Sequence, residues 1–368
     1  MTFETGEVVS RLIAWGLADE RAIVEGDLEI RSAARRNRNL RLDRRRGASY
    51  LIKEPEPGTH STLRAEARFY EFCRREPRVA AVVPLLARWH AFHPAETVVV
   101  LEVVRDCRSL WDEYRATGAP ELPEGPARAL GKALALVHTT FRGLDPDAES
   151  YLTELTTEPP WILGVHRPAP EILRRLSRAK RRILEIVQDD ADIAAGLDAA
   201  AAGWRTETVI HGDVRSDNVL VVADGGGNVG VKLIDWELVR RGDPAWDVAG
   251  AFHELLLFWL LGMPLAPDLE PAARIAEASW PLSAVQSAVR AFWQEYAATD
   301  DHARRPGAKL LRRAVGMAGA RLIQAAWEYS READRLTSLS VLLLQLAANI
   351  LRDPVAASSD LLGLPVEI

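Results

Sequence analysis

The spacing of apolar residues changes early in the chain. Val8, Leu12, Trp15 and Ile23 recur at helical intervals and predict an opening helix or two. Short runs with strand-like alternation follow and predict five strands, at Asp27–Ile30, Leu40–Leu42, Ser49–Lys53, Leu85–His90 and Thr97–Val103. A helix over Ser61–Arg75 is expected between the third and fourth strands, ending before Pro77. The pattern therefore predicts a β-rich N-terminal part that contains one helix.

Helical periodicity dominates from Ser109 onward. The clearest case is Pro126–Phe141, where apolar residues form one stripe, and residues 170–203 and 282–350 are also helical in pattern. Short β-branched runs interrupt this region at residues 209–210, 219–222 and 229–234, the last two separated by a glycine-rich turn. We therefore expect two domains, residues 1–104 and 105–368, with a small hairpin embedded in the second.

The composition narrows the class of protein. Apolar residues make up 48% and charged residues 27% of the 368 positions, which allows a sizeable core and argues against disorder. Two cysteines are too few for a disulfide framework or a four-thiolate zinc site and fit a reducing compartment. The net charge of −6 gives no reason to expect nucleic-acid binding. No signal peptide is visible, and the apolar run Leu255–Leu261 is too short to span a bilayer, so we expect a cytoplasmic protein without a membrane partner.

Candidate chemistry is concentrated in residues 211–218, which read His-Gly-Asp-Val-Arg-Ser-Asp-Asn. Asp213 and Asn218 lie five positions apart, and the predicted hairpin that follows returns a second carboxylate, Asp235, beside them. Phosphoryl transfer from ATP needs a carboxylate that accepts the proton of the attacking hydroxyl and oxygen ligands for Mg²⁺. We therefore expect Asp213 to be the base, and Asn218 and Asp235 to bind Mg²⁺.

Three ordered motifs carry a family resemblance: His-Gly-Asp with Asn five residues after the Asp, Ile-Asp-Trp-Glu at 234–237, and Gly-Asp-Pro-Ala-Trp-Asp at 242–247. Together they resemble the aminoglycoside phosphotransferase and choline kinase-like superfamily. The resemblance implies an α+β, two-lobed protein kinase-like fold, with a small antiparallel β-sheet lobe that includes a helix and a larger, mainly helical C-terminal lobe.

The same resemblance assigns an ATP site. Such families carry a lysine on the third strand and a glutamate on the following helix, and Lys53 and Glu66 occupy these places here. The nucleotide would lie between the lobes, with its adenine bonded to the backbone of the connecting segment, at Glu102 and Val104. The implied cofactors are ATP and Mg²⁺.

A basic turn replaces the glycine-rich loops of other nucleotide sites. Neither Gly-x-Gly-x-x-Gly nor a Walker-type lysine loop occurs, whereas residues 31–46 contain eight arginines and one aspartate. Arg35, Arg36 or Arg38 would fold over the triphosphate in one interpretation. The alternatives are a solvated hairpin and a surface that grips an acidic partner or leader peptide.

Arg215 lies two positions after the expected base. It would either stabilise charge on the transferring phosphoryl group or brace the loop. His211, in contrast, is expected to brace the catalytic loop by hydrogen bonds rather than to carry protons. The His-Gly-Asp motif lacks the arginine that senses a phosphorylated activation loop in many protein kinases. Phosphorylation control of that kind is therefore not expected.

Three functions remain open at this point. The first is transfer of the γ-phosphate to a hydroxyl of a small molecule. The second keeps this chemistry but uses Ser or Thr of a precursor peptide in lanthipeptide-like biosynthesis. The third is a catalytically silent kinase-like binding module, which the retention of Asp213, Asn218 and Asp235 disfavours.

Overall fold

The computed structural model describes residues 5–32, 38–55, 62–146, 149–174, 176–224, 228–266, 269–303, 309–330 and 333–364. The chain forms two compact units. The N-terminal unit is Met1–Asp106 together with Asp235–Leu238, and the C-terminal unit is Cys107–Ile234 together with Val239–Ile368. The short segment that returns to the N-terminal unit was not foreseen from the sequence. It brings Asp235 into the same unit as Lys53 and Glu66.

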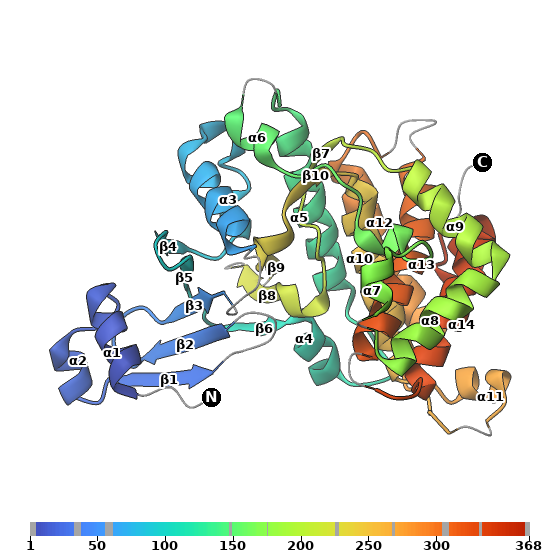
Figure 1. The fold of residues 1–368 in the computed structure, drawn as a ribbon, viewed down its shortest axis with the longest axis horizontal. Coiled ribbons are helices and arrows are strands. Elements are labelled where there is room, and N and C mark those ends of the chain that lie inside the picture. Colours follow the sequence, from blue (N-terminus) through green and yellow to red (C-terminus); the bar gives the residue numbers. More distant parts are fainter. Residues whose placement is uncertain are drawn as a thin grey trace. The chain divides into compact units, whose positions relative to one another are not determined.

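The N-terminal unit is built on one antiparallel five-stranded sheet with the order β1-β2-β3-β5-β4. Its strands are β1 Leu28–Ser32, β2 Arg38–Arg44, β3 Tyr50–Glu54, β4 Trp89–His93 and β5 Val98–Glu102. Its helices are α1 Thr5–Ala14, α2 Glu20–Val24 and α3 Leu63–Arg75, the last lying between β3 and β4 in the chain (Figure 1). The expected order of elements is therefore confirmed.

The two faces of this sheet have different roles. Side chains alternate along a strand, so neighbouring residues point to opposite faces. Ile52 packs with Leu12 of α1 and with Val100 in a buried apolar cluster on one face. Lys53, the next residue, faces the other way and meets Glu66 of α3. The strand thus directs one residue into the core and the next into a polar site.

One predicted strand was displaced. The strand expected at Leu85–His90 begins only at Trp89, because a 3₁₀ turn occupies Val83–Leu85. Pro84 lies in the first turn of this short helix, where its fixed φ is favourable and its missing N–H costs nothing. Two three-residue strands, β6 Cys107–Ser109 and β10 Arg240–Gly242, were not predicted. Their sequences, Cys-Arg-Ser and Arg-Arg-Gly, lack the β-branched residues that indicated a strand at residues 209–210.

The C-terminal unit is mainly helical, as predicted. Its described helices are α4 Leu110–Thr117, α5 Glu124–Arg142, α6 Ser150–Glu154, α7 Pro170–Leu173, α8 Arg178–Asp189, α9 Ala191–Ala202, α10 Pro244–Leu261, α11 Pro271–Ala276, α12 Leu282–Thr299, α13 Leu310–Tyr329, α14 Ser338–Arg352 and α15 Pro354–Ala356. Two small antiparallel sheets accompany them: β6-β8-β9, with β8 Val219–Asp224 and β9 Asn228–Leu233, and β7-β10, with β7 Thr208–Ile210.

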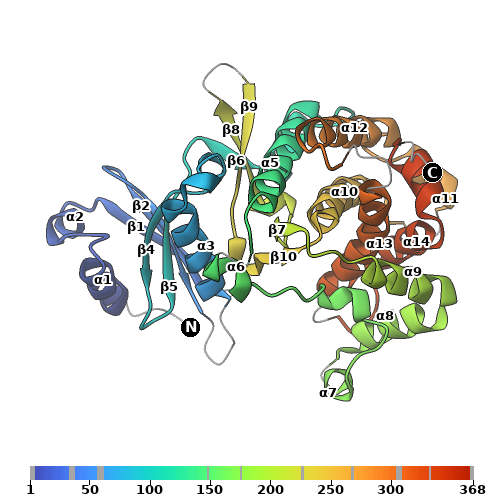
Figure 2. The same cartoon turned by 90° about the horizontal axis from the view of Figure 1, so that it is seen from above.

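Helix α10 forms the centre of this unit. Every residue from Pro244 to Leu260 is buried, and α10 contacts α12, α13 and α14 (Figure 2). A helix with so few polar residues is stable only when other elements surround it. Gly250 lies where α10 approaches the loop after β7, since an added Cβ would lie 2.8 Å from the carbonyl oxygen of Val214. The helix therefore supports this loop directly.

None of the described helices is on its own both long enough and apolar enough to cross a bilayer. The bent pair Ser338–Arg352 and Pro354–Leu361, with an angle of 107° between its parts, meets these requirements by length and composition only.

Candidate functional site

Lys53, Glu66 and Asp235 form a charged group in the N-terminal unit. The Lys53 ammonium donates hydrogen bonds to both carboxylate oxygens of Glu66 at 2.8 Å and to Oδ1 of Asp235 at 2.6 Å. The side chains of Lys53 and Glu66 are 3% and 0% exposed, whereas that of Asp235 is 34% exposed. The structure thus brings together three residues that the sequence predicted for nucleotide and metal binding, and Asp235 is the one accessible from solvent.

Local structure fixes this arrangement. Glu66 lies in the first turn of α3, and it also accepts a hydrogen bond from the backbone N–H of Trp236 at 3.2 Å. Trp236 is fully buried and stacks on Phe69 of α3 at 4.1 Å between ring centroids. Asp235 has a φ of +68°, a conformation that costs energy for a residue with a side chain. The contacts of Trp236 hold the backbone in this turn, and the turn directs the Asp235 carboxylate at Lys53.

Burial and charge act against each other in this group. Burial alone would lower the pKa of Lys53, but the carboxylates of Glu66 and Asp235 outweigh it and raise the pKa above its usual range. Burial raises the pKa of Glu66 to about 7, with further contributions from the charges of Asp235 and Glu237, and Lys53 opposes this shift. Lys53 is therefore a permanent cation at this site, suited to an anionic ligand.

Residues 211–218, called the catalytic loop after the role predicted for them, belong to the C-terminal unit and begin where β7 ends. His211 contacts the carbonyl oxygen of Ile234 through Nε2 at 2.9 Å, and its Nδ1 accepts the backbone N–H of Asp213 at 3.3 Å. His211 is thus a bracing residue, as predicted. Gly212 has a φ of +81°, in the left-handed region that favours glycine, which explains the glycine of the His-Gly-Asp motif.

Asp247 of α10 anchors the start of this loop. Its carboxylate accepts the backbone N–H groups of His211 at 2.7 Å and Gly212 at 2.9 Å, and it also contacts Nε2 of His138 at 3.1 Å. Burial would raise the pKa of Asp247, but these hydrogen bonds and the charges of His138 and His211 lower it below its usual value. Asp243, at the start of the same helix, caps α10 by accepting the N–H of Ala245. Both aspartates therefore support the loop and the helix.

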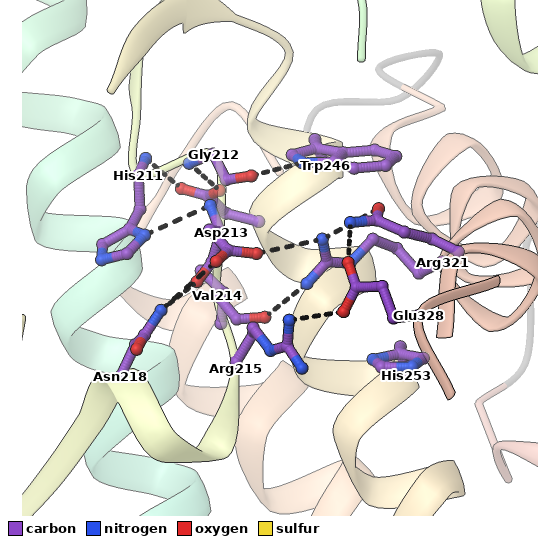
Figure 3. A network of polar contacts seen from close by, with 12 residues as sticks. His211, Gly212, Asp213, Val214, Arg215, Asn218, Trp246, His253, Arg321 and Glu328 are labelled. Carbon is purple, nitrogen blue, oxygen red and sulfur yellow. Dashed lines mark hydrogen bonds and ion pairs between the residues drawn. The ribbon is translucent and has the colours of Figure 1, made fainter. Parts of the chain in front are cut away.

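Asp213 and Asn218 lie next to each other within the loop. The Asn218 amide nitrogen donates to the carbonyl oxygen of Asp213 at 3.0 Å and lies 3.5 Å from Oδ2 of the Asp213 carboxylate (Figure 3). The other carboxylate oxygen, Oδ1, lies 3.4 Å from Nη1 of Arg321 on α13. Since the amide nitrogen of Asn218 is engaged within the loop, its oxygen is the atom suited to a cation.

Arg215 has a partner outside the loop. Its guanidinium forms an ion pair with Glu328 of α13 at 2.7 Å, as Figure 3 shows. Burial would lower the pKa of Arg215, but the carboxylates of Glu328, Asp213 and Glu254 raise it. In this arrangement the side chain braces the loop against α13, one of the two roles expected from the sequence.

The remaining predicted residues are placed as follows. Glu102 ends β5, its N–H donates to the carbonyl oxygen of Arg88 at 2.8 Å, and Val104 follows two residues later. Arg38 begins β2 and pairs in register with Glu54 of β3. Arg35 and Arg36 lie outside the described residues. The contact of the basic turn with the triphosphate therefore stays a prediction.

Sequence reasoning missed several polar residues around the catalytic loop. They are Arg321, Gln324 and Glu328 on α13 and Glu254 on α10, which accepts hydrogen bonds from the N–H of Ser216 at 2.8 Å and from its hydroxyl. A weak signal existed for Arg321, because it is a lone charged residue in the apolar stretch Ala314–Trp327. A charge on the buried face of a helix requires a polar partner, but the spacing does not reveal which one.

The residues predicted to bind Mg²⁺ carry oxygen atoms, which are the donors that this ion prefers. Among the residues that the structure describes, no three His, Cys, Asp or Glu side chains gather as a metal site. Mg²⁺ does not need such a cluster, because it is held by one or two protein oxygens together with phosphate oxygens and water. Asn218 and Asp235 would supply one amide and one carboxylate oxygen.

The sequence model of the phosphotransferase enzyme family matches residues 27–281, which is more than half of the chain. The chain belongs to this family. The class of enzyme expected from the sequence, a phosphotransferase with a hydroxyl acceptor, is thereby confirmed. No match was found among curated proteins.

Solved structures agree on the fold of this phosphotransferase. The choline kinase from Cryptosporidium parvum is similar with a TM-score of 0.57 and 11% identity, over 95% of this chain and 98% of that chain. The choline/ethanolamine kinase family protein from Mesorhizobium loti is similar with a TM-score of 0.52 and 14% identity, over 93% and 94%. The structure of LicA in complex with AMP is similar with a TM-score of 0.54 and 12% identity, over 95% of this chain and 99% of that chain. LicA from Streptococcus pneumoniae is described as a choline kinase. The predicted kinase-like fold is thus confirmed.

Proposed function

We propose that this protein is a Mg²⁺- and ATP-dependent phosphotransferase that moves the γ-phosphate to a hydroxyl group of a small molecule. The observation that carries the proposal is the Lys53–Glu66–Asp235 group, in which a buried lysine is held by a buried glutamate and contacts a partly exposed aspartate. A buried ammonium costs free energy, and this cost is more readily explained by an anionic ligand than by stability alone.

Each half of the machinery has its own task. Lys53, held by Glu66, would contact the phosphates of the nucleotide. The two proposed metal ligands are linked by a backbone hydrogen bond. The N–H of Ile234 donates to the carbonyl oxygen of Asn218 at 2.9 Å, and Asp235 directly follows Ile234. Asn218 and Asp235 would hold Mg²⁺, which when bound neutralises charge on the phosphate oxygens.

Asp213 would act on the acceptor. Its carboxylate would orient the attacking hydroxyl and take its proton as the new O–P bond forms and the bond to the leaving ADP breaks. The adenine is proposed to bond the backbone at Glu102 and Val104, which is carried over from the family resemblance. Arg215 would contribute chiefly by bracing the loop, given its ion pair with Glu328.

A small-molecule acceptor is preferred over a peptide. The similar solved structures are described as choline kinases or as a choline/ethanolamine kinase family protein, which act on small molecules. Nothing in these comparisons favours a precursor peptide. The basic turn remains the one feature that would suit an acidic leader, and reversing the charges of Arg35, Arg36 and Arg38 tests it. A large rise in the KM for ATP would support contact with phosphate, and weakened peptide binding would support the leader.

The decisive test is Asp213→Asn, measured by ADP release against a panel of hydroxyl acceptors. Loss of a positioned general base should lower turnover by roughly 10²–10⁴ while nucleotide binding is retained. If the wild type and the variant transfer phosphate equally, Asp213 is not the base. If both bind ATP and neither transfers phosphate to any acceptor, the binding-module alternative is favoured. The same acceptor panel would identify the substrate class.

A further inference from the structure

A buried arginine from a distant part of the chain contacts the proposed base. Arg321 lies in the middle of α13 and is 3% exposed. Its Nη1 lies 3.4 Å from Oδ1 of Asp213, and its Nη2 donates to the carbonyl oxygen of Val214 at 2.9 Å. Figure 3 shows the guanidinium directed at the catalytic loop from the side of α13. One side chain thus binds two consecutive loop residues.

The guanidinium is itself held on two sides. Nη1 also donates to Oε1 of Gln324, one turn further along α13, at 3.2 Å. The guanidinium carbon lies 5.2 Å from the ring centroid of Trp246, within the range of a cation–π interaction. Trp246 in turn donates its indole N–H to the carbonyl oxygen of Gly212 at 2.9 Å. Trp246 and Arg321 therefore fix Gly212, Asp213 and Val214 together.

The two arginines near Asp213 have different partners. Arg215, on the loop, pairs with Glu328 of α13, and Gln324 donates to the same carboxylate at 2.9 Å. Arg321, on α13, contacts Asp213 on the loop. The loop and the helix thus exchange one ion pair in each direction, with two cations balanced by two carboxylates. Because Arg215 is engaged by Glu328, the cation against Asp213 comes from α13.

The geometry separates the two oxygens of the Asp213 carboxylate. Oδ1 is directed at Arg321, and Oδ2 lies on the side of Asn218. A carboxylate held at one oxygen cannot turn freely about its Cβ–Cγ bond, so the other oxygen keeps a fixed direction. A base needs such a fixed direction to accept a proton from a hydroxyl within hydrogen-bond reach.

We propose that Arg321 is a positioning residue for phosphoryl transfer, which acts by holding Asp213 in the orientation that accepts the proton of the acceptor hydroxyl. This inference depends on the proposed function of Asp213. It adds a residue that lies outside the three sequence motifs and more than a hundred positions from the base. It also assigns a role to the charge buried in α13.

The test is a double-mutant cycle of Arg321→Met and Asp213→Asn. Misplacement of a catalytic group should lower kcat by roughly 10- to 100-fold, with the KM for ATP unchanged. In the Asp213→Asn background, Arg321→Met should have no further effect on the residual rate, because the residue acts through Asp213. Arg321→Lys keeps the charge but not the two-pronged geometry, so it should recover part of kcat.

Arg313 provides a matched control on the same helix. It pairs with Asp243 at 2.8 Å and with Glu207 at 3.2 Å, away from the catalytic loop. Any effect of Arg313→Met on the rate should combine with that of Asp213→Asn multiplicatively, as expected for independent sites.

Several outcomes would overturn the proposal. An equal fall in rate from Arg321→Met in both backgrounds would show that Arg321 does not act through Asp213, and so would a raised KM for ATP with unchanged kcat. If Arg321→Met does not fold, the same cycle with Arg321→Lys decides by the same criterion. A full rate in Asp213→Asn alone would instead refute the proposed function of Asp213, whatever Arg321 does.

Discussion

The two halves of the proposed machinery are stabilised in different ways. In the N-terminal unit, Lys53, Glu66 and Asp235 hold one another directly, so the residues proposed to act are also the residues that build the site. In the C-terminal unit, the loop that carries Asp213 and Asn218 is held by side chains of α10 and α13. A mutation in the first half therefore affects stability and function together, whereas the second half allows them to be separated.

Lys53→Met should have the largest effect. It leaves Glu66 buried without its cation, which should lower the free energy of unfolding by about 3 kcal/mol, and it removes the proposed phosphate contact, which should lower kcat/KM for ATP by roughly 10²-fold or more. Chemical denaturation and ADP-release kinetics measure the two effects. The double variant Lys53→Met/Glu66→Gln should regain much of the stability and none of the activity. Recovery of both would contradict the proposed role of Lys53.

The pH dependence of stability in Glu254→Gln tests whether the Glu254 carboxylate supports the catalytic loop. Burial would raise the pKa of Glu254, but His253 and the hydrogen bonds from Ser216 outweigh it and lower the pKa to about 2 from an ordinary value of 4.5. A lowered pKa contributes stability above pH 4.5 that is lost as the pH falls toward 2. As the pH falls through this range, the free energy of unfolding of the wild type, measured with urea, should decrease by up to roughly 3 kcal/mol more than that of the variant. Parallel curves for the two proteins would argue against this assignment.

Asp247→Asn should weaken the anchor of the catalytic loop. The amide can accept only on one side, so one of the N–H groups of His211 and Gly212 would face an NH₂ group. We expect a loss of about 2 kcal/mol in unfolding free energy and faster hydrogen exchange at the amide of His211 or of Gly212, whichever loses its acceptor. Tyr296→Phe, which removes only the hydroxyl bonded to His138 at 2.8 Å, is the control and should leave both amides protected. Unchanged exchange in Asp247→Asn would refute the anchoring role.

Gly250→Ala should separate function from nucleotide binding. The added methyl group would press on Val214 and displace the catalytic loop, at a cost of roughly 1–3 kcal/mol. We expect a lower kcat with an unchanged KM for ATP, because the Lys53 group is not touched. Gly316→Ala on α13 meets nothing within 4 Å and should be neutral or slightly stabilising. Equal kinetics for the two variants would show that the loop tolerates the displacement.

The difference between the two units also explains which site residues could be predicted from the sequence. The Lys53 and Glu66 pair was predicted from the family resemblance, and the structure has the ion pair. A lysine at the end of a strand is a weak signal by itself, because most such lysines are solvated. Asp213, Asn218 and Asp235 belong to one compact motif linked by a hairpin. The sequence thus placed Asp213 and Asn218 in one loop, where the structure has them side by side. It did not show that Asp235 belongs to the N-terminal unit.

Arg321 and Glu328 could not be assigned in this way. They lie more than a hundred residues from the loop they contact, and helical spacing shows which face of α13 they share but not what that face meets. Their partners are set by the packing of α10 against α13, which depends on side-chain fit along whole helices. The displaced β4 has a local cause instead, since Pro84 begins a 3₁₀ turn within an apolar run that otherwise reads as a strand.

The hairpin of β8 and β9 has a further consequence. Its register pairs Val219 with Leu233 and continues to Asp224 and Asn228 at the far end. Because the ladder fixes the near ends, Asn218 and Ile234 remain opposite each other whatever number of residues joins the far ends. The tip is therefore the natural place to insert a peptide tag or reporter, whereas a single residue inserted within either strand would alter the separation that the two ends impose.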